Sequence, residues 1–240
     1  MEKARKQGAL AQRLGRTEKV VAKAAASLAE VTPPEDVAGA HAELVKGLQG
    51  LAGALEKAGA AVEARSLCVA SSVMARLGEA RAAPGLRAAV KALRDKGYEV
   101  EKLVPRAVPM ANRRLASGEL LVPVEGYGPG GLTIENGLGR DAVALLREGK
   151  RTVASVYVRR ESQAEIRGIP DGTYRLFFTI GNDWDAKLGR FTRMCEFKRF
   201  DDEFAFESAG YTITSWSVTL HPVVGGGAAS SEVDPDEFPG

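Results

Sequence analysis

The sequence predicts an α+β protein of two domains, an antiparallel helical bundle followed by an antiparallel β-sandwich. Three observations predict it: composition changes sharply near residue 107, apolar residues before that point recur every three or four positions, and apolar residues beyond about 118 alternate with polar ones. At 240 residues the chain exceeds the usual size of one domain. Each half is long enough to bury a core of its own.

These changes divide the chain into four expected parts. We expect an alanine-rich bundle of three or four helices over 1–107, a linker with room for a first strand over 108–130 and a β-sandwich over 131–224. An acidic tail over 225–240 should be flexible unless Phe238 docks. Hydrophobic residues make up 45% and charged residues 27%, which are ordinary globular values. No apolar run approaches the ~20 residues that cross a bilayer.

The first two helices are predicted by a coiled-coil rhythm. One stripe is formed by Leu10, Leu14, Thr17, Val21, Ala24, Leu28 and Val31. A second helix should begin after Thr32, with Thr32 as its cap, Pro33 in the first position and Glu35 returning a hydrogen bond, and should run to about residue 65. Two long helices joined by so short a break should fold back as a hairpin.

Glycines inside the second helix each cost about 1 kcal/mol relative to alanine. They are Gly39, Gly47, Gly50, Gly53 and Gly59. Either they allow neighbouring helices to approach closely, or they soften the helix so that it can rearrange. A third helix is expected over 66–82 through Leu67, Ala70, Met74 and Leu77, ended by Pro84 and Gly85, and a fourth should stop at Gly97.

The second half alternates in hydrophobicity and has turn residues at short intervals, which indicates consecutive antiparallel strands. The clearest runs from Thr173 to Ile180, after a Pro-Asp-Gly turn. The expected strands are 131–136, 141–148, 151–159, 162–168, 173–180, 192–199, 203–207 and 211–220. So many short strands in about 105 residues are typical of a two-sheet sandwich.

The motif GIPDGTYRLFF resembles the strand-turn-strand element of transthyretin-like and carboxypeptidase-regulatory-like domains. The longer series LTIENG, DAVALL, VYVRR, IRGIPDGTYRLFFTIGNDWD, FKRFDDEFAFE and WSVTLHPVVGGGA, over about 130–228, is similar to a widespread bacterial β-sandwich domain. That domain closes chains whose N-terminal parts vary. The resemblance implies a bacterial protein with a recurring accessory module, and it brings no catalytic residues.

Charge and the scarcity of histidine limit the chemistry. Residues 1–107 carry 18 Lys/Arg against 12 Asp/Glu, and residues 108–240 carry 15 against 19. The basic first helix has no interleaved aromatic residues for base stacking, so nucleic acid is not an expected partner. The only histidines, His41 and His221, lie beside no nucleophile motif or metal-ligand spacing, and GYGPGG at 126–131 lacks the lysine of a phosphate loop. An enzyme is therefore not expected.

The remaining candidate constellation is acidic. Asp183 and Asp185 lie in GNDWDAK, and Asp201 and Asp202 lie in RFDDEF, which reads as a turn. If both segments meet at one end of the sandwich, their oxygens could gather around Ca²⁺, the one cofactor this sequence suggests. The alternative is solvated turn carboxylates paired with neighbours such as Arg190, Arg193 or Arg199. Trp184 is either an exposed stacking residue for a glycan or protein, or an apolar plug over the sandwich.

These patterns favour a non-enzymatic structural or interaction protein. The helical half would assemble with itself or with a protein partner through Leu10, Leu14, Val21 and Leu28, and the sandwich would act as a recognition or assembly module with Trp184 as a contact residue. Alternatives are a calcium- or carbohydrate-binding module and a membrane-active two-domain effector. We expect a cytoplasmic protein if Met1 is the native start, and an extracytoplasmic one if an export or anchor segment has been removed.

Overall fold

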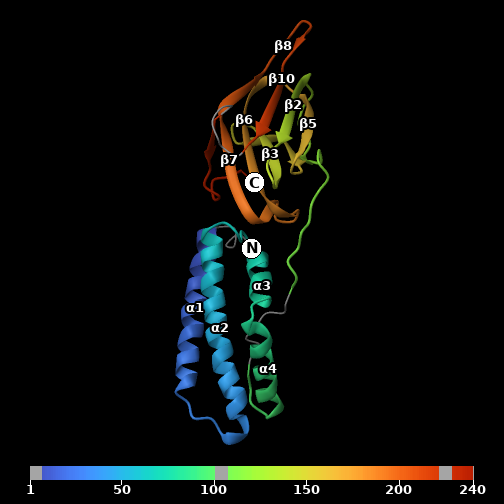
Figure 1. Cartoon of the computed structure of the whole chain (residues 1–240). Helices are drawn as coiled ribbons and strands as arrows, with labels where there is room; N and C mark the ends of the chain where they lie inside the picture. Colours follow the sequence, from blue (N-terminus) through green and yellow to red (C-terminus); the bar gives the residue numbers. More distant parts are fainter. Residues whose placement is uncertain (1–6, 101–107, 222–228, 240) are drawn as a thin grey trace. The chain divides into compact units, whose positions relative to one another are not determined.

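The computed structural model describes residues 7–100, 108–221 and 229–239. The chain divides into two compact units, Met1–Ala111 and Asn112–Gly240, of which the first is helical and the second is built of strands (Figure 1). The predicted α+β fold of two domains is confirmed. The change between units falls a few residues beyond 107, and most of the expected linker, from Asn112 onward, belongs to the second unit.

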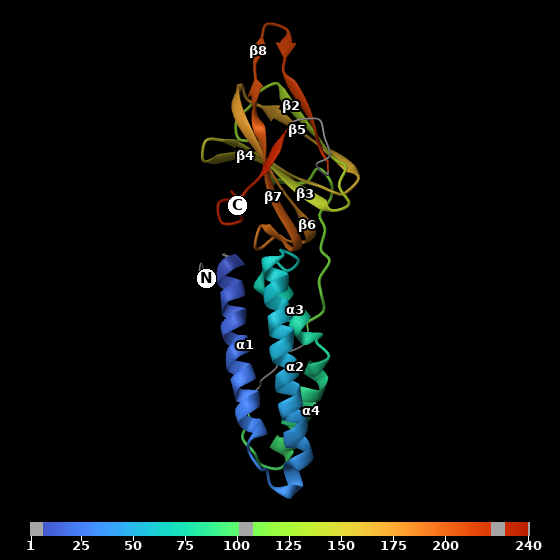
Figure 2. The ribbon, with the colours of Figure 1, turned by 60° about the vertical axis from the view of Figure 1, so that its left-hand side comes forward.

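The helical unit is a bundle around its longest helix. Its elements are α1 (Gln7–Ala29), a 3₁₀ turn η2 (Glu35–Val37), α2 (Ala38–Glu63), α3 (Ala70–Gly78) and α4 (Ala82–Asp95). α1 and α2 lie side by side as an antiparallel hairpin in both views (Figures 1 and 2). The core includes Leu44, Leu48, Leu51 and Leu55 of α2 with Leu86, Val90 and Leu93 of α4.

Two details of the helices differ from the prediction. Thr32 is not a cap, because η2 begins at Glu35 behind Pro34, whose side chain makes no capping hydrogen bond. The third helix, expected over 66–82, is the shorter α3. Pro84 does not end this helix but lies in the first turn of α4, where a missing N–H has no cost. Val73 rather than the 42% exposed Met74 faces the core.

Two glycines of α2 explain how α4 packs. A Cβ atom on Gly47 would lie 2.9 Å from Leu86 Cβ, and one on Gly50 would lie 2.6 Å from Ala82 Cβ, both too short for real contacts. Close approach, one of the two interpretations of the glycines, is therefore correct at these positions. A Cβ on Gly53 would meet no atom within 4 Å, so that glycine is not explained by packing.

The second unit is a β-sandwich of two sheets and a projecting hairpin (Figure 2). Its strands are β1 (Leu120–Val122), β2 (Gly130–Asn136), β3 (Asp141–Glu148), β4 (Arg151–Val158), β5 (Ser162–Ile169), β6 (Gly172–Asp185), β7 (Arg190–Phe206), β8 (Ser208–Ala209), β9 (Thr212–Ile213), β10 (Ser215–Leu220) and β11 (Ser230–Glu232). The six-stranded sheet has the order β1-β4-β3-β6-β7-β11, and the three-stranded sheet has the order β10-β2-β5.

The core of the sandwich is contributed by the inner faces of both sheets. The three-stranded sheet supplies residues such as Leu132, Ile134 and Ile166, and the six-stranded sheet supplies Leu146 and Leu176. Pairing is antiparallel except between β10 and β2, which run parallel because the chain crosses from one sheet to the other before β10. The predicted strands over 192–199 and 203–207 are one strand, β7, and Thr173–Ile180 is part of the longer β6.

Two segments expected to be loose are built into the sandwich. Gly128, in the expected linker, donates its N–H to Gly168 O, and a Cβ there would lie 2.3 Å from Ile169 O, so only glycine fits. The acidic tail was expected to be flexible, but within its described part, 229–239, β11 pairs with β7. Phe238 packs its ring against Phe177 and Phe197 at centroid distances of 6.1 and 5.1 Å.

Candidate binding pocket on the sandwich

The segment that enters the second unit is fixed to the six-stranded sheet by Arg113. Its backbone N–H and Nε both donate to Asp183 Oδ1 at 2.8 Å, and its Nη2 donates to Asp183 Oδ2 at 2.8 Å. Its Nη1 donates to Asp185 Oδ2 at 2.9 Å. Asp183 is only 4% exposed and also accepts a hydrogen bond from Thr192 Oγ1 at 2.6 Å. The carboxylate is thus fully occupied by protein donors.

These donors decide the protonation of the buried carboxylate. Burial alone would raise the pKa of Asp183, but the hydrogen bonds from Arg113 and Thr192 outweigh burial and lower the pKa to about 2. The same hydrogen bonds raise the pKa of the Arg113 guanidinium. Asp183 is therefore ionised at neutral pH and serves to anchor the entering segment.

A second ion pair lies next to the first. Arg114 donates from Nε and Nη2 to the two carboxylate oxygens of Asp141 at 2.7 and 2.6 Å, and Arg160 N–H donates to Asp141 Oδ1 at 2.9 Å. The hydroxyl of Tyr157 also donates to Asp141. Burial and this contact raise the pKa of Tyr157, so the phenol stays protonated. Both buried carboxylates hold structure together, and neither is left open for catalysis.

The four predicted calcium ligands do not come together. Asp183 and Asp185 bind Arg113 beside the β6–β7 turn, whereas RFDDEF is not a turn and Asp201 and Asp202 lie within β7. Asp202 is next to Glu203, which pairs with Arg175 of β6. This position is several residues along β7 from the β6–β7 turn, and each residue of a strand adds ~3.3 Å. Asp201 Oδ1 accepts from Ser231 Oγ at 2.6 Å. Among the described residues no group of three or more His, Cys, Asp or Glu could hold a metal ion.

The predicted interaction residues are used inside the protein. Leu14 is 7% exposed, and Leu10, Val21 and Leu28 are half-buried against the same helical core, where α1 meets α2. Trp184 is 5% exposed and packs edge-on against Tyr157 and Phe191, with centroid distances of 6.1 and 5.0 Å. Of the two interpretations of Trp184, the buried one is correct, although its ring covers the outer face of the six-stranded sheet.

That outer face carries an apolar pocket of about 300 Å³. Its floor consists of outward-facing residues of neighbouring strands, including Val143 and Leu145 of β3, Thr179 of β6 and Phe197 of β7. The C-terminal segment forms one wall. Its lining residues are Leu121, Val122, Val143, Leu145, Thr152, Ser155, Thr179, Trp184, Ala186, Gly189, Arg190, Phe197, Pro235, Phe238 and Pro239. It lies entirely within the second unit.

Two residues of the pocket lining each have a polar atom that is buried without a partner among the described residues. These atoms are the hydroxyl Oγ1 of Thr179, a residue 4% exposed, and the indole Nε1 of Trp184. Thr179 projects outward because its neighbours Phe178 and Ile180 point into the sandwich core. A buried donor without a partner costs about 1–3 kcal/mol. Each of the two atoms has less than 1 Å² of accessible surface, so neither opens into the pocket in this structure.

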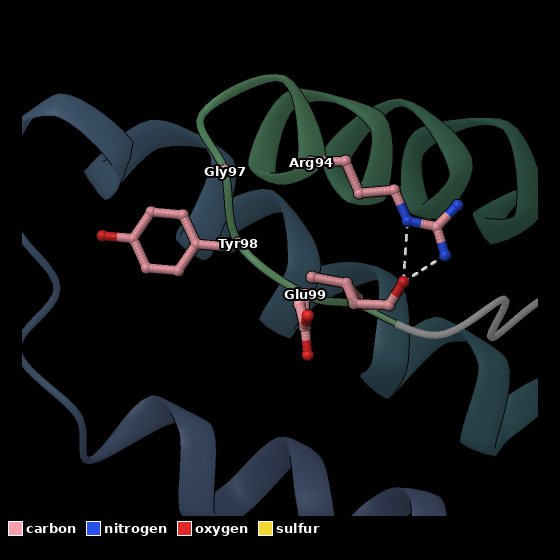
Figure 3. A pocket seen from close by; sticks show the side chains of 5 residues that line it. Arg94, Gly97, Tyr98 and Glu99 are labelled. Atoms are coloured by element: carbon pink, nitrogen blue, oxygen red, sulfur yellow. Dashed lines mark hydrogen bonds between the residues drawn. The ribbon is translucent and has the colours of Figure 1, made fainter.

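A larger hollow of about 590 Å³ in the helical unit carries less chemistry (Figure 3). It is lined by Arg94, Gly97, Tyr98, Glu99 and Val100, and Figure 3 shows Arg94 donating from its guanidinium to the carbonyl of Val100. Gly97 ends α4 as predicted, with φ of +88°. Arg94 is already occupied by this hydrogen bond to Val100.

The sequence signalled the pocket only indirectly. Trp184 stood out, but Thr179 read as one of the polar positions of an alternating strand, and the tail was not expected to form a wall.

Comparison of the chain with protein-family models, curated proteins and solved structures found no match in any of the three. None of the described helices is long and apolar enough to span a membrane.

Proposed function

We propose that this chain is a non-enzymatic binding protein whose β-sandwich recognises a small, mostly apolar molecule with a hydrogen-bond acceptor. The observation that carries the proposal is the apolar pocket, two of whose lining residues, Thr179 and Trp184, have a buried polar atom without a partner among the described residues. Ligand pockets are commonly apolar with a few placed polar groups that orient the ligand. An indole N–H can only donate, so the ligand must supply an acceptor.

The sandwich is a better candidate for recognition than the helical stripe. Leu10, Leu14, Val21 and Leu28 are covered by the bundle itself, so assembly of the helical half would have to use a different surface. The carbohydrate alternative required an exposed Trp184, and that ring is 5% exposed. Ion pairing of Asp183 and Asp185 with Arg113 supports the arginine-paired interpretation of these carboxylates over a calcium site.

The test is to titrate 2-octanone, a neutral molecule with one carbonyl acceptor, into the full chain. The chain has two tryptophans, so its ¹⁵N–¹H spectrum contains two indole N–H peaks, which Trp216→Phe assigns. We expect the Trp184 peak to shift downfield and saturate, since the carbonyl accepts its hydrogen bond. Thr179→Val should weaken binding, and Tyr211→Ala, at a fully exposed position on the projecting hairpin, should not. A Trp184 peak that stays in place would overturn the proposal.

A further inference from the structure

The C-terminal segment 229–239 lies on the sandwich as a bound peptide would. We propose that the edge of β7, together with the rings of Phe177 and Phe197, is a docking site for an acidic peptide of another protein, and that segment 229–239 occupies this site when no partner is bound. The inference goes beyond the proposed function, because it concerns a different ligand and needs no small molecule in the pocket.

The backbone contacts of the segment are those by which a free peptide adds a strand to a sheet. Its strand β11 pairs antiparallel with β7. On one side of this ladder, Asp201 N–H donates to Ala229 O at 2.9 Å. On the other side, Val233 N–H donates to Phe197 O at 2.9 Å. Main-chain hydrogen bonds of this kind give affinity for an extended peptide whatever its side chains, so specificity must come from elsewhere.

One source of specificity is the ring of Phe238. After the strand, Phe238 N–H donates to Asp234 O at 3.0 Å, so the segment turns back toward the sheet. The ring of Phe238 then packs against Phe177 of β6 and Phe197 of β7, with centroid distances of 6.1 and 5.1 Å. The site therefore fits a peptide with a short extended stretch and, a few residues later, an aromatic side chain.

A second source of specificity is charge. Segment 229–239 has no basic residue and four acidic ones, which are Glu232, Asp234, Asp236 and Glu237. The paired part of β7 contains Lys198 and Arg199, and the register places Glu232 opposite Lys198. Lys198 also lies 3.8 Å from Glu196, which reduces its attraction for a ligand. The charges favour an acidic peptide over a basic one by a modest factor.

The segment is held by few contacts, so it can be replaced. Every residue from 229 to 239 is half-buried or exposed. β11 spans 3 residues, whereas β7 spans 17. Elements with little buried apolar surface open at a lower free energy than the core strands of a domain. Opening of the segment leaves β6 and β7 in place, because their ladder with each other does not include it.

A second copy of this chain is the competing occupant, because its segment 229–239 has the same chemistry. The covalent connection to β10 gives each chain's own segment an effective concentration on the order of millimolar at the edge of β7. The identical segment of a second copy does not overcome this advantage at ordinary protein concentrations. A peptide of another protein can overcome it by binding more tightly, which favours that occupant.

The test cuts the connection of the segment in the full, folded chain. A protease recognition sequence replaces residues 223–227, and the purified chain is cut there. A fluorescent peptide with the sequence of residues 229–239 is then added in excess, and its anisotropy is measured. We expect the peptide to replace the cut segment. Its binding to the uncut chain should be weaker by about tenfold or more, because the connected segment competes.

Two matched peptides test the two sources of specificity. Phe238→Ala in the peptide should weaken binding to the cut chain about tenfold, because the contacts with Phe177 and Phe197 are lost. Glutamine at the four acidic positions should weaken binding about threefold at low salt, and this difference should disappear at about 1 M salt. If the Phe238→Ala peptide binds as tightly as the original peptide, the aromatic contact does not define the site and the inference is overturned.

Three further outcomes would overturn the inference. A cut chain that takes up no peptide, or that loses its strand circular dichroism when the segment is removed, would show that β11 is a permanent part of the fold. Equal binding of the peptide to the cut and uncut chains would place the peptide elsewhere. An uncut chain that is a dimer by light scattering and becomes a monomer on cutting would assign the edge to a second copy. None of these outcomes affects the proposed function, because 2-octanone is titrated into the uncut chain.

Discussion

Two buried threonines show how differently the same side chain is used on the two long strands of the sandwich. Thr179 Oγ1 has no partner among the described residues, whereas Thr192 Oγ1 donates to Asp183 Oδ2 at 2.6 Å. Valine has nearly the shape of threonine but no hydroxyl. The contrast separates a buried hydroxyl without a partner among the described residues from one that stabilises the fold.

We predict opposite effects of valine at these positions in the ligand-free protein. Thr179→Val should raise the free energy of unfolding by about 1 kcal/mol, because it removes an unpaired buried hydroxyl. Thr192→Val should lower it by about 1–3 kcal/mol, because Asp183 loses a donor. Urea denaturation of the two variants measures both changes. A loss of stability at Thr179 as large as that at Thr192 would mean that the Thr179 hydroxyl has a structural partner.

Asp183 should also make the stability of the sandwich depend on pH in the acidic range. Its pKa falls from the ordinary 3.8 to about 2 on folding, because Arg113 and Thr192 donate to the ionised form. A depressed folded-state pKa adds stability that is fully present above pH ~4 and is lost as the pH falls through about 2. The contribution is about 2 kcal/mol. Asp183→Asn should remove this contribution, which urea denaturation at a series of pH values between 2 and 5 measures.

Single residues also show what sequence reasoning could and could not find. GNDWDAK marked Asp183, Asp185 and Trp184 as unusual, and in the structure the two aspartates pair with Arg113 and Trp184 is buried. Their partner Arg113 lies 70 positions earlier, in a stretch that reads as a linker, and no local pattern connects the two. The calcium interpretation depended on RFDDEF being a turn. Its polar residues are instead exposed within β7, at a point where the register with β6 shifts.

At the scale of elements, the spacing of apolar residues predicted most of the fold. Both the helical spacing of three or four residues and the two-residue alternation of strands are clear in the sequence. Strand limits such as 141–148 agree with β3, and the helical hairpin agrees with α1 and α2. Failures occurred where a tertiary contact decides the conformation. Gly128 fits against Ile169 by close approach, and the tail forms β11 because the edge of β7 accepts it. Neither contact has a signature in a local stretch of sequence.

The glycines of α2 allow a paired test of helix packing. Gly47→Ala should destabilise the helical unit by about 1–3 kcal/mol, because the new methyl group would lie 2.9 Å from Leu86 Cβ and force α4 away. Gly53→Ala places a methyl group where no atom lies within 4 Å, so it should stabilise the same helix by up to about 1 kcal/mol. Thermal unfolding followed by helical circular dichroism checks both. Equal effects would show that α2 and α4 can adjust their separation freely.

At the scale of the whole molecule, the division at Ala111 and Asn112 decides which fragments should fold. A fragment beginning at 118, where alternation in the sequence begins, omits Arg113 and Arg114. It leaves Asp183 and Asp141, which are 4% and 5% exposed, without their arginines. Removing one partner of a buried ion pair is strongly destabilising. A fragment that begins at 118 should therefore be less stable than one that begins at 112 and keeps both arginines.

We predict that fragment 112–240 folds cooperatively and that fragment 118–240 loses about 3 kcal/mol or more of stability. Urea denaturation followed by tryptophan fluorescence measures the difference, since the backbone N–H of Trp184 donates a hydrogen bond to Arg113 O, in the lost segment, at 3.0 Å. Arg113→Gln combined with Arg114→Gln in the longer fragment is the matched control, and it should reproduce most of the loss. If the shorter fragment is as stable as the longer one, the two arginines contribute nothing measurable to the free energy of unfolding, and the pocket wall beside Trp184 does not depend on them.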